Sequence, residues 1–223
     1  MRLWSILFIL LTAPVPAYSG AWLREKGKGL SSNTVTVTQN YDISESTFIE
    51  YGVRDDLTLG AEVSFLASSY GLQSGSATLF LRRPLGRQGR PNVWSAELGI
   101  GAAWVGDVVT PNVKAGLSWG RGFTLAQKNG WITIDSSLSW DVYLHEHLAK
   151  VDSTVGIDLG ERFSGMLQLF HASTSTTTAT SIAPSIIVRP IKSRPDIRLQ
   201  IGAETLITDS SNPALKLSIW REF

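Results

Sequence analysis

The chain has 223 residues, with 20 basic and 19 acidic side chains and no cysteine. A net charge this close to zero gives no electrostatic footprint for nucleic acid. The absence of cysteine excludes disulfide bonds, thiolate catalysis and cysteine-bound metals.

Residues 1–19 have the features of a secretory signal peptide. Arg2 precedes an apolar run that is too short to span a bilayer, and the stretch Ala17-Tyr18-Ser19 offers a cleavage site. We expect cleavage near Ser19, which removes one of the 20 basic residues and no acidic one, and leaves residues 20–223 with 19 of each. A buried N-terminal strand is the alternative, although its two prolines would interrupt a β-ladder.

No later stretch approaches 18 consecutive apolar residues, so the sequence predicts no helical membrane span after residue 19. An exported chain without disulfides needs another source of stability. A closed β-barrel supplies one, because every strand edge is paired and each backbone polar group finds a partner within the sheet.

Twelve segments with alternating side chains begin at Gly29 and are separated by residues typical of turns. An even number suits a bacterial barrel with both chain ends in the periplasm, and ten strands is the nearest alternative. The expected strands are residues 29–39, 44–53, 57–66, 74–83, 92–105, 111–119, 129–141, 147–159, 163–171, 179–190, 196–206 and 213–223.

The fifth segment, VWSAELGIGAAW, shows the alternation most clearly. Trp94, Trp104 and the apolar residues between them share one face, while Glu97 lies on the other. At about 3.3 Å per residue and a tilt of about 40°, the two indoles lie about 25 Å apart along the barrel axis. That is the spacing of two membrane interfaces, so we expect both residues in the aromatic belts. The same belts are expected to hold Trp119, Trp131, Trp140 and Trp220.

The polar faces of the strands carry charges of both signs. In a membrane barrel these faces line the lumen, where charges either select solutes in an open pore or pair across a narrow interior and plug it. Both interpretations stay open, and twelve strands would make any channel narrow. The predicted lumen charges are Glu50, Glu62, Arg82, Glu97, Lys114, Asp135, Lys150, Asp152, Asp158, Arg198, Glu204 and Lys216.

The turns indicate an orientation. The tight joints at 54–56 and 160–162 both connect an even strand to an odd one and therefore share one end of the barrel, which we take as periplasmic. Long joints at 84–91 and 120–128 are exceptions to this asymmetry. The expected outer loops are 68–75, 107–111, 141–147 and 172–179.

The C-terminal stretch ALKLSIWREF places Leu215, Leu217, Ile219 and Phe223 at alternating positions. It resembles the signal that outer-membrane barrels present to their assembly machinery. Arg221 departs from that signal, because it occupies a place where an apolar or aromatic residue is usual.

The stretches GAWLREKGKG and EYGVRDDLTLGAEVSF resemble a family of bacterial outer-membrane proteins. These proteins open with Gly-Ala-Trp and a Lys-Gly pair and carry a Glu-Tyr-Gly hairpin turned by an acidic residue. The resemblance covers Gly20 to Phe65. It implies an outer-membrane barrel from a largely uncharacterised family, in some cases described as transport-related, and it identifies no substrate.

His171 and Ser173 form the first of two candidate chemical sites. Lipid hydrolases of the outer membrane use a histidine and a serine near the outer rim. On one face of a strand, however, the two Cα atoms lie about 7 Å apart, too far for a nucleophile and its base without rearrangement. A solvated rim histidine is the simpler interpretation, so no catalytic residue is assigned.

His145 and His147 form the second candidate. Two histidines on one side of a strand could begin a metal site, which Asp141 or Glu146 would have to complete. A solvated outer loop is the simpler interpretation here too. No metal or cofactor residue is therefore assigned.

The sequence thus predicts an all-β, transmembrane, up-and-down barrel in the outer membrane of a Gram-negative bacterium. A narrow channel for small polar solutes is the favoured function; a sealed structural or binding barrel and a lipid hydrolase are the alternatives. The expected partners are outer-membrane lipid, lipopolysaccharide and the barrel assembly machinery. Neither a cofactor nor nucleic acid is expected, and the sequence favours a protein that is not an enzyme.

Overall fold

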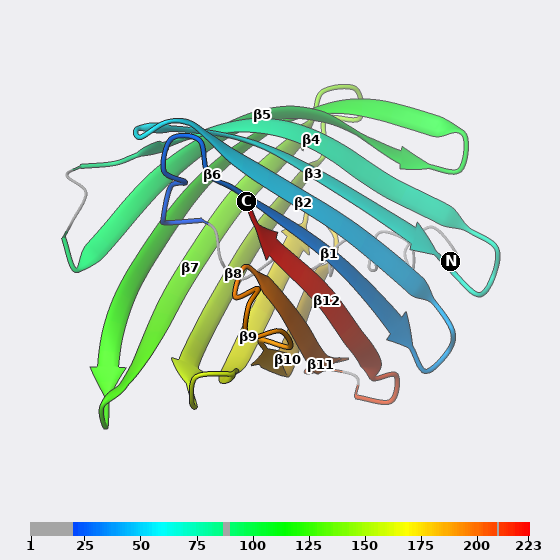
Figure 1. The fold of residues 1–223 in the computed structure, drawn as a ribbon. Helices are drawn as coiled ribbons and strands as arrows, with labels where there is room; N and C mark the ends of the chain where they lie inside the picture. The colour runs from blue at the N-terminus through cyan, green and yellow to red at the C-terminus, as the bar shows by residue number, and fades with distance from the viewer. Residues whose placement is uncertain (1–19, 87–89, 209) are drawn as a thin grey trace.

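The computed structural model describes residues 20–86, 90–208 and 210–223, which form one closed antiparallel barrel. The predicted signal peptide, residues 1–19, lies outside the described residues. Each strand pairs with its neighbours in sequence, and β1 pairs with β12 to close the wall (Figure 1). The strands are β1 (Gly29–Thr38), β2 (Ile43–Arg54), β3 (Leu57–Ala67), β4 (Gln73–Pro84), β5 (Asn92–Val105), β6 (Val108–Leu125), β7 (Lys128–Asp141), β8 (His147–Asp158), β9 (Phe163–Thr174), β10 (Thr178–Val188), β11 (Ile197–Leu206) and β12 (Ala214–Glu222).

The predicted twelve-stranded barrel is confirmed, but two of the expected connections are wrong. Strand β6 begins at Val108 and continues to Leu125, well beyond the expected 111–119. The expected loop at 107–111 is therefore a tight turn at Gly106 and Asp107, and the expected long joint at 120–128 is a tight turn at Ala126 and Gln127.

The backbone of the second turn explains why the sequence does not predict it. Ala126 has φ 48° and Gln127 has φ 63°, so both central residues are left-handed. Two left-handed residues form the hairpin turn whose twist matches the strands, and that turn usually carries Asn-Gly or Asp-Gly. The pair Ala-Gln gives no such signal.

The barrel has two ends, which we name from the chain termini. The terminal rim carries Gly29, Phe223 and the connections from even to odd strands, whereas the distal rim carries the connections from odd to even strands. Both rims have connections of two residues and connections of seven or more, so the expected difference in loop length between the two ends is not observed.

Side chains of the wall alternate between a polar lumen and an apolar outer surface. On β5, Glu97 is 8% exposed, whereas Leu98 and Ile100 are 70% and 67% exposed. An outer surface of this kind is typical of barrels surrounded by lipid. In the part of the chain that the structure describes, no helix is long and apolar enough to cross a membrane.

Candidate functional site in the lumen

A row of alternating charges begins on the lumen side of β2. Glu50 accepts a hydrogen bond from Arg24 Nε at 2.8 Å and another from Arg82 Nη1. Arg82 Nη2 also donates to Glu97 Oε2 at 2.6 Å, because the register of β4 and β5 places these two residues opposite each other. The three residues of the wall are buried, so each charge depends on its partners rather than on solvent.

Lys114 continues this row onto β6. Its Nζ lies 3.0 Å from Glu97 Oε1 and 3.0 Å from Glu62 Oε2. The ring of Phe80 lies beside the same cations, with its centroid 5.0 Å from the Arg82 guanidinium carbon and 5.7 Å from Lys114 Nζ. We call this set the charge ladder; its members are Arg24, Glu50, Glu62, Arg82, Glu97 and Lys114.

A smaller polar cluster lies on the lumen side of β9, β11 and β12. Lys216 Nζ donates to Gln168 Oε1 at 3.1 Å and lies 4.7 Å from the centroid of the Phe170 ring. Gln200 Nε2 donates to Ser185 Oγ at 3.0 Å. The sequence prediction included Lys216 but neither glutamine, because uncharged polar residues occur on both faces of many strands.

An apolar cluster fills part of the lumen. Leu30, Met166, Ile187 and Trp220 are buried together, and Trp131 packs against them. This cluster is an interior one, although most apolar side chains of the strands lie on the outer surface of the barrel.

The expected places of Trp220 and Trp131 in the interface belts are therefore wrong. Trp220 Nε1 donates to Ser218 Oγ at 2.8 Å, and both residues face the lumen with Lys216, as the alternation of β12 requires. Trp131 packs against the same interior cluster. The belt prediction used only the closeness of each tryptophan to a strand end. That criterion does not distinguish an indole that faces the lumen from one that faces outward.

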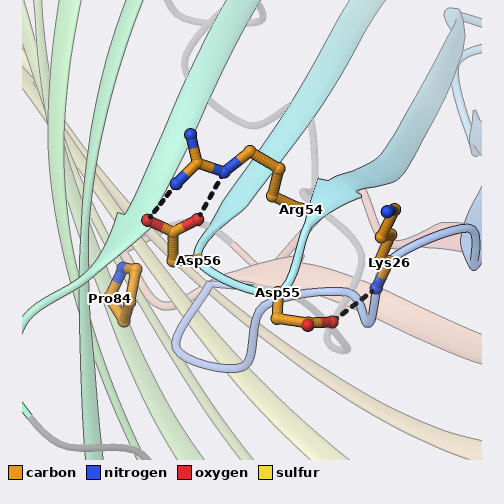
Figure 2. A pocket seen from close by; sticks show the side chains of 5 residues that line it. All are labelled: Lys26, Arg54, Asp55, Asp56 and Pro84. Atoms are coloured by element: carbon orange, nitrogen blue, oxygen red, sulfur yellow. Dashed lines mark hydrogen bonds and ion pairs between the residues drawn. The ribbon is translucent and has the colours of Figure 1, made fainter.

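Residues 20–28 precede β1 and enter the lumen from the terminal rim. Gly27 N donates to Gly52 O at 2.8 Å, and Gly52 N donates to Lys28 O at 2.9 Å, so the segment is tied to the end of β2. Figure 2 shows the neighbouring anchor, where Lys26 N donates to Asp55 Oδ1 at 3.1 Å. Sequence alternation gave no signal for this segment, because it lies outside the strands.

The segment also contacts β3 and β5. Arg24 N donates to Thr58 Oγ1 at 3.1 Å, and Gly20 O accepts a hydrogen bond from Ser95 Oγ. Gly20 and Ala21 are buried. Residues 20–24 therefore occupy part of the lumen beside the charge ladder.

A cavity of about 330 Å³ lies in the distal half of the lumen. The Glu62–Lys114 ion pair belongs to its wall, and hydroxyl groups and a second lysine, Lys150, line much of the rest. Among the described residues, Lys150 forms no direct ion pair, although its charge acts on the nearby carboxylates of Glu62 and Asp152. We call this cavity the vestibule; its lining includes Glu62, Ser76, Thr78, Asn112, Lys114, Ser137, Ser139, Asp141, Glu146, His147 and Lys150.

Three of the remaining predicted lumen charges lie on β7, β8 and β11. Asp135 and Asp152 face each other across the β7–β8 ladder. Glu204 accepts a hydrogen bond from Ser181 Oγ at 2.7 Å. A role in solute selection for these charges stays a prediction.

The last two predicted lumen charges form ion pairs near the terminal rim. Arg198 Nη2 lies 3.1 Å from Glu222 Oε1, and Asp158 Oδ1 lies 3.5 Å from Arg189 Nη2. Both pairs are far from the vestibule along the strands. Their part in solute selection is likewise still a prediction.

The candidate hydrolase pair has other contacts. His171 Nδ1 and Thr180 Oγ1 are 2.8 Å apart, while Ser173 Oγ donates to the backbone oxygen of Thr174. The histidine and the serine therefore do not form a nucleophile–base hydrogen bond with each other.

Three residues of the candidate metal site, His147, Asp141 and Glu146, have other contacts. His147 stacks on Trp140 with ring centroids 6.4 Å apart. Asp141 accepts hydrogen bonds from the backbone of Tyr143 and Leu144, and Glu146 accepts one from Ser175 Oγ. Among the described residues, no group of three or more potential metal ligands is found.

On the outer wall, Trp94 is exposed and lies 6.4 Å from Trp119 between ring centroids. Trp104 lies opposite Gly75, at the other end of β5. A place for these indoles in the two membrane interfaces stays a prediction.

The C-terminal strand completes the wall. Phe223 exchanges backbone hydrogen bonds with Gly29 of 2.6 and 3.0 Å, which continues the closing ladder. The outward row of β12 comprises Leu215, Leu217 and Ile219, each about half exposed, and Phe223 is exposed beyond them. Their expected part in assembly stays a prediction.

The whole barrel is similar to solved porins. The KdgM porin, also solved in complex with disordered oligogalacturonate, is 8% identical, with a TM-score of 0.59 over 87% of this chain and 99% of that chain. The NanC porin is 12% identical, with a TM-score of 0.57 over 85% and 98%.

An outer membrane channel from Pseudomonas putida F1 is 12% identical, with a TM-score of 0.55 over 94% of this chain and 100% of that chain. No family model matches the sequence, and no curated protein matches it. At these identities the likeness shows the fold alone: this chain is folded as outer-membrane barrel porins are.

Proposed function

We propose that this protein is a narrow outer-membrane channel for small polar solutes, with the distal rim outside the cell and both termini in the periplasm. The observation that carries the proposal is the vestibule, a cavity in the distal half of a barrel whose outer surface is apolar. Charged and hydroxyl-bearing side chains line it together with Leu144 and Leu148. A polar lumen inside an apolar wall is the arrangement through which hydrophilic solutes cross a membrane.

The lining of the vestibule favours a particular class of solute. Its serine and threonine hydroxyl groups suit hydroxylated molecules, and Lys150 supplies a positive charge beside them. A small hydroxy acid, such as an acidic monosaccharide, would match both features. The KdgM porin, solved with oligogalacturonate, shares the fold, which supports this choice of solute.

A sealed structural barrel is the second candidate, and the filled part of the lumen favours it. Residues 20–24 and the apolar cluster around Trp220 both occupy space there. A channel would then conduct only along the space that these groups leave open. The lipid hydrolase gains no comparable support, because His171 and Ser173 are bonded to different partners.

The test is ion selectivity in planar bilayers. Lys150→Glu should raise the ratio of cation to anion permeability by about twofold or more, because it reverses a charge in the pathway. Lys192→Glu is the matched control, since it makes the same charge change at an exposed residue in the β10–β11 connection. Equal selectivity in the two variants would contradict a pathway through the vestibule.

A further inference from the structure

The contacts of Gly20 are unusually close. Its backbone oxygen accepts a hydrogen bond from Ser95 Oγ on β5. A Cβ atom placed on Gly20 would overlap the carboxylate of Asp135 on β7 and the hydroxyl of Ser118 on β6. The backbone of residue 20 therefore lies directly against the Asp135 side chain.

The Asp135 carboxylate lacks a full set of partners. Its Oδ1 atom is buried and accepts no hydrogen bond from any described residue. A buried carboxylate oxygen without a donor is costly, because Oδ1 has lost its water, and the hydrogen bond of Ser118 to the carboxyl does not replace it at that atom. Asp152 lies opposite on β8, so two carboxyl groups share this part of the lumen.

The charges around this point are also unequal. Among the six residues of the charge ladder together with Asp135, Lys150 and Asp152, five side chains are acidic and four are basic. One further positive charge beside Asp135 would make the two sets equal. The acidic side chains are Glu50, Glu62, Glu97, Asp135 and Asp152, and the basic ones are Arg24, Arg82, Lys114 and Lys150.

We propose that Asp135 is the binding site for the α-ammonium group of Gly20, which cleavage after Ser19 would create inside the lumen. The ammonium supplies the donor that Asp135 Oδ1 lacks and the positive charge that balances the cluster. Ser95 holds the carbonyl group of the same residue. Processing of the chain thereby fixes residues 20–24 in the lumen. This proposal rests on the predicted cleavage site and is independent of whether the barrel conducts.

The experiment measures how fast the α-amine of Gly20 reacts. The protein is produced from the full chain, purified from the outer membrane in detergent, and treated at neutral pH with a water-soluble acetylating reagent. Mass spectrometry of the N-terminal peptide identifies the first residue and its extent of acetylation. Lys26 and Lys28, which are exposed, serve as internal references.

The amine in the folded protein should react at least about tenfold more slowly than in urea-unfolded protein, a factor equivalent to about 1.4 kcal/mol. Asp135→Asn should remove most of this protection. Glu204→Gln, which alters a buried lumen carboxylate on β11, should retain it. The proposal is overturned if the mature chain begins elsewhere, if the folded wild-type amine reacts as fast as the unfolded one, or if Asp135→Asn leaves protection unchanged.

Discussion

At the scale of single residues, Glu97 is the acid on which two lumen cations depend. It accepts a hydrogen bond from Arg82 and lies 3.0 Å from Lys114, and it is 8% exposed. Glu97→Gln should lower the free energy of unfolding by about 3 kcal/mol, because Arg82 and Lys114 each lose one of their two carboxylate partners in a buried site. Urea titration of the refolded barrel in lipid vesicles measures this change.

The control for Glu97 is an exposed ion pair. Asp196 pairs with Arg194 in the β10–β11 connection, and the hydrogen bond from Arg194 lowers the pKa of the Asp196 carboxyl. Asp196→Asn should leave the urea midpoint essentially unchanged, since solvent screens exposed pairs. An equal loss of stability in both variants would show that burial of the charge ladder contributes nothing.

The sequence could predict which wall charges face inward but not how they pair. Alternation places Arg82 and Glu97 on polar faces, and the pairing of those faces depends on strand register. The sequence could not predict that Arg24 joins the charge ladder, because Arg24 lies before the first strand. It reaches the ladder only because residues 20–28 enter the lumen.

At the scale of elements, the β6–β7 turn carries a backbone cost. Gln127 has φ 63°, a conformation that costs a residue with a side chain about 1–2 kcal/mol. Gln127→Gly should therefore raise the free energy of unfolding by up to about 1 kcal/mol, after the greater backbone entropy of glycine is counted. The same urea titration measures it.

The β5–β6 turn allows the reverse substitution, in which a left-handed glycine is replaced by a residue with a side chain. Gly106 has φ 57°, so Gly106→Ala should destabilise the barrel by about 1 kcal/mol. If Gln127→Gly also destabilised it, the left-handed turn geometry would be wrong. These turns also mark where sequence prediction was weakest. Alternation placed most strands within a few residues, but both ends of β6 were wrong, and its end at Leu125 is followed by a turn that contains neither Asn nor Gly.

At the scale of the whole molecule, closure follows from twelve paired strands, but orientation in a membrane needs its own test. The chain has no cysteine, so single cysteines can report each rim. Tyr70→Cys lies in a distal connection and Glu161→Cys in a terminal one, and both residues are exposed.

A membrane-impermeant maleimide should label Tyr70→Cys in intact cells and Glu161→Cys only after the outer membrane is permeabilised. The reverse pattern would contradict the proposed orientation while leaving the barrel itself in place.

The central claim is that the lumen conducts, and single-channel recording tests it most directly. Wild-type protein, shown to be folded by its heat-dependent mobility on gels, is added to a planar bilayer in potassium chloride. We predict discrete current steps of small, uniform size, as a narrow twelve-stranded barrel requires. A silent bilayer from folded protein would contradict the channel and favour the sealed barrel.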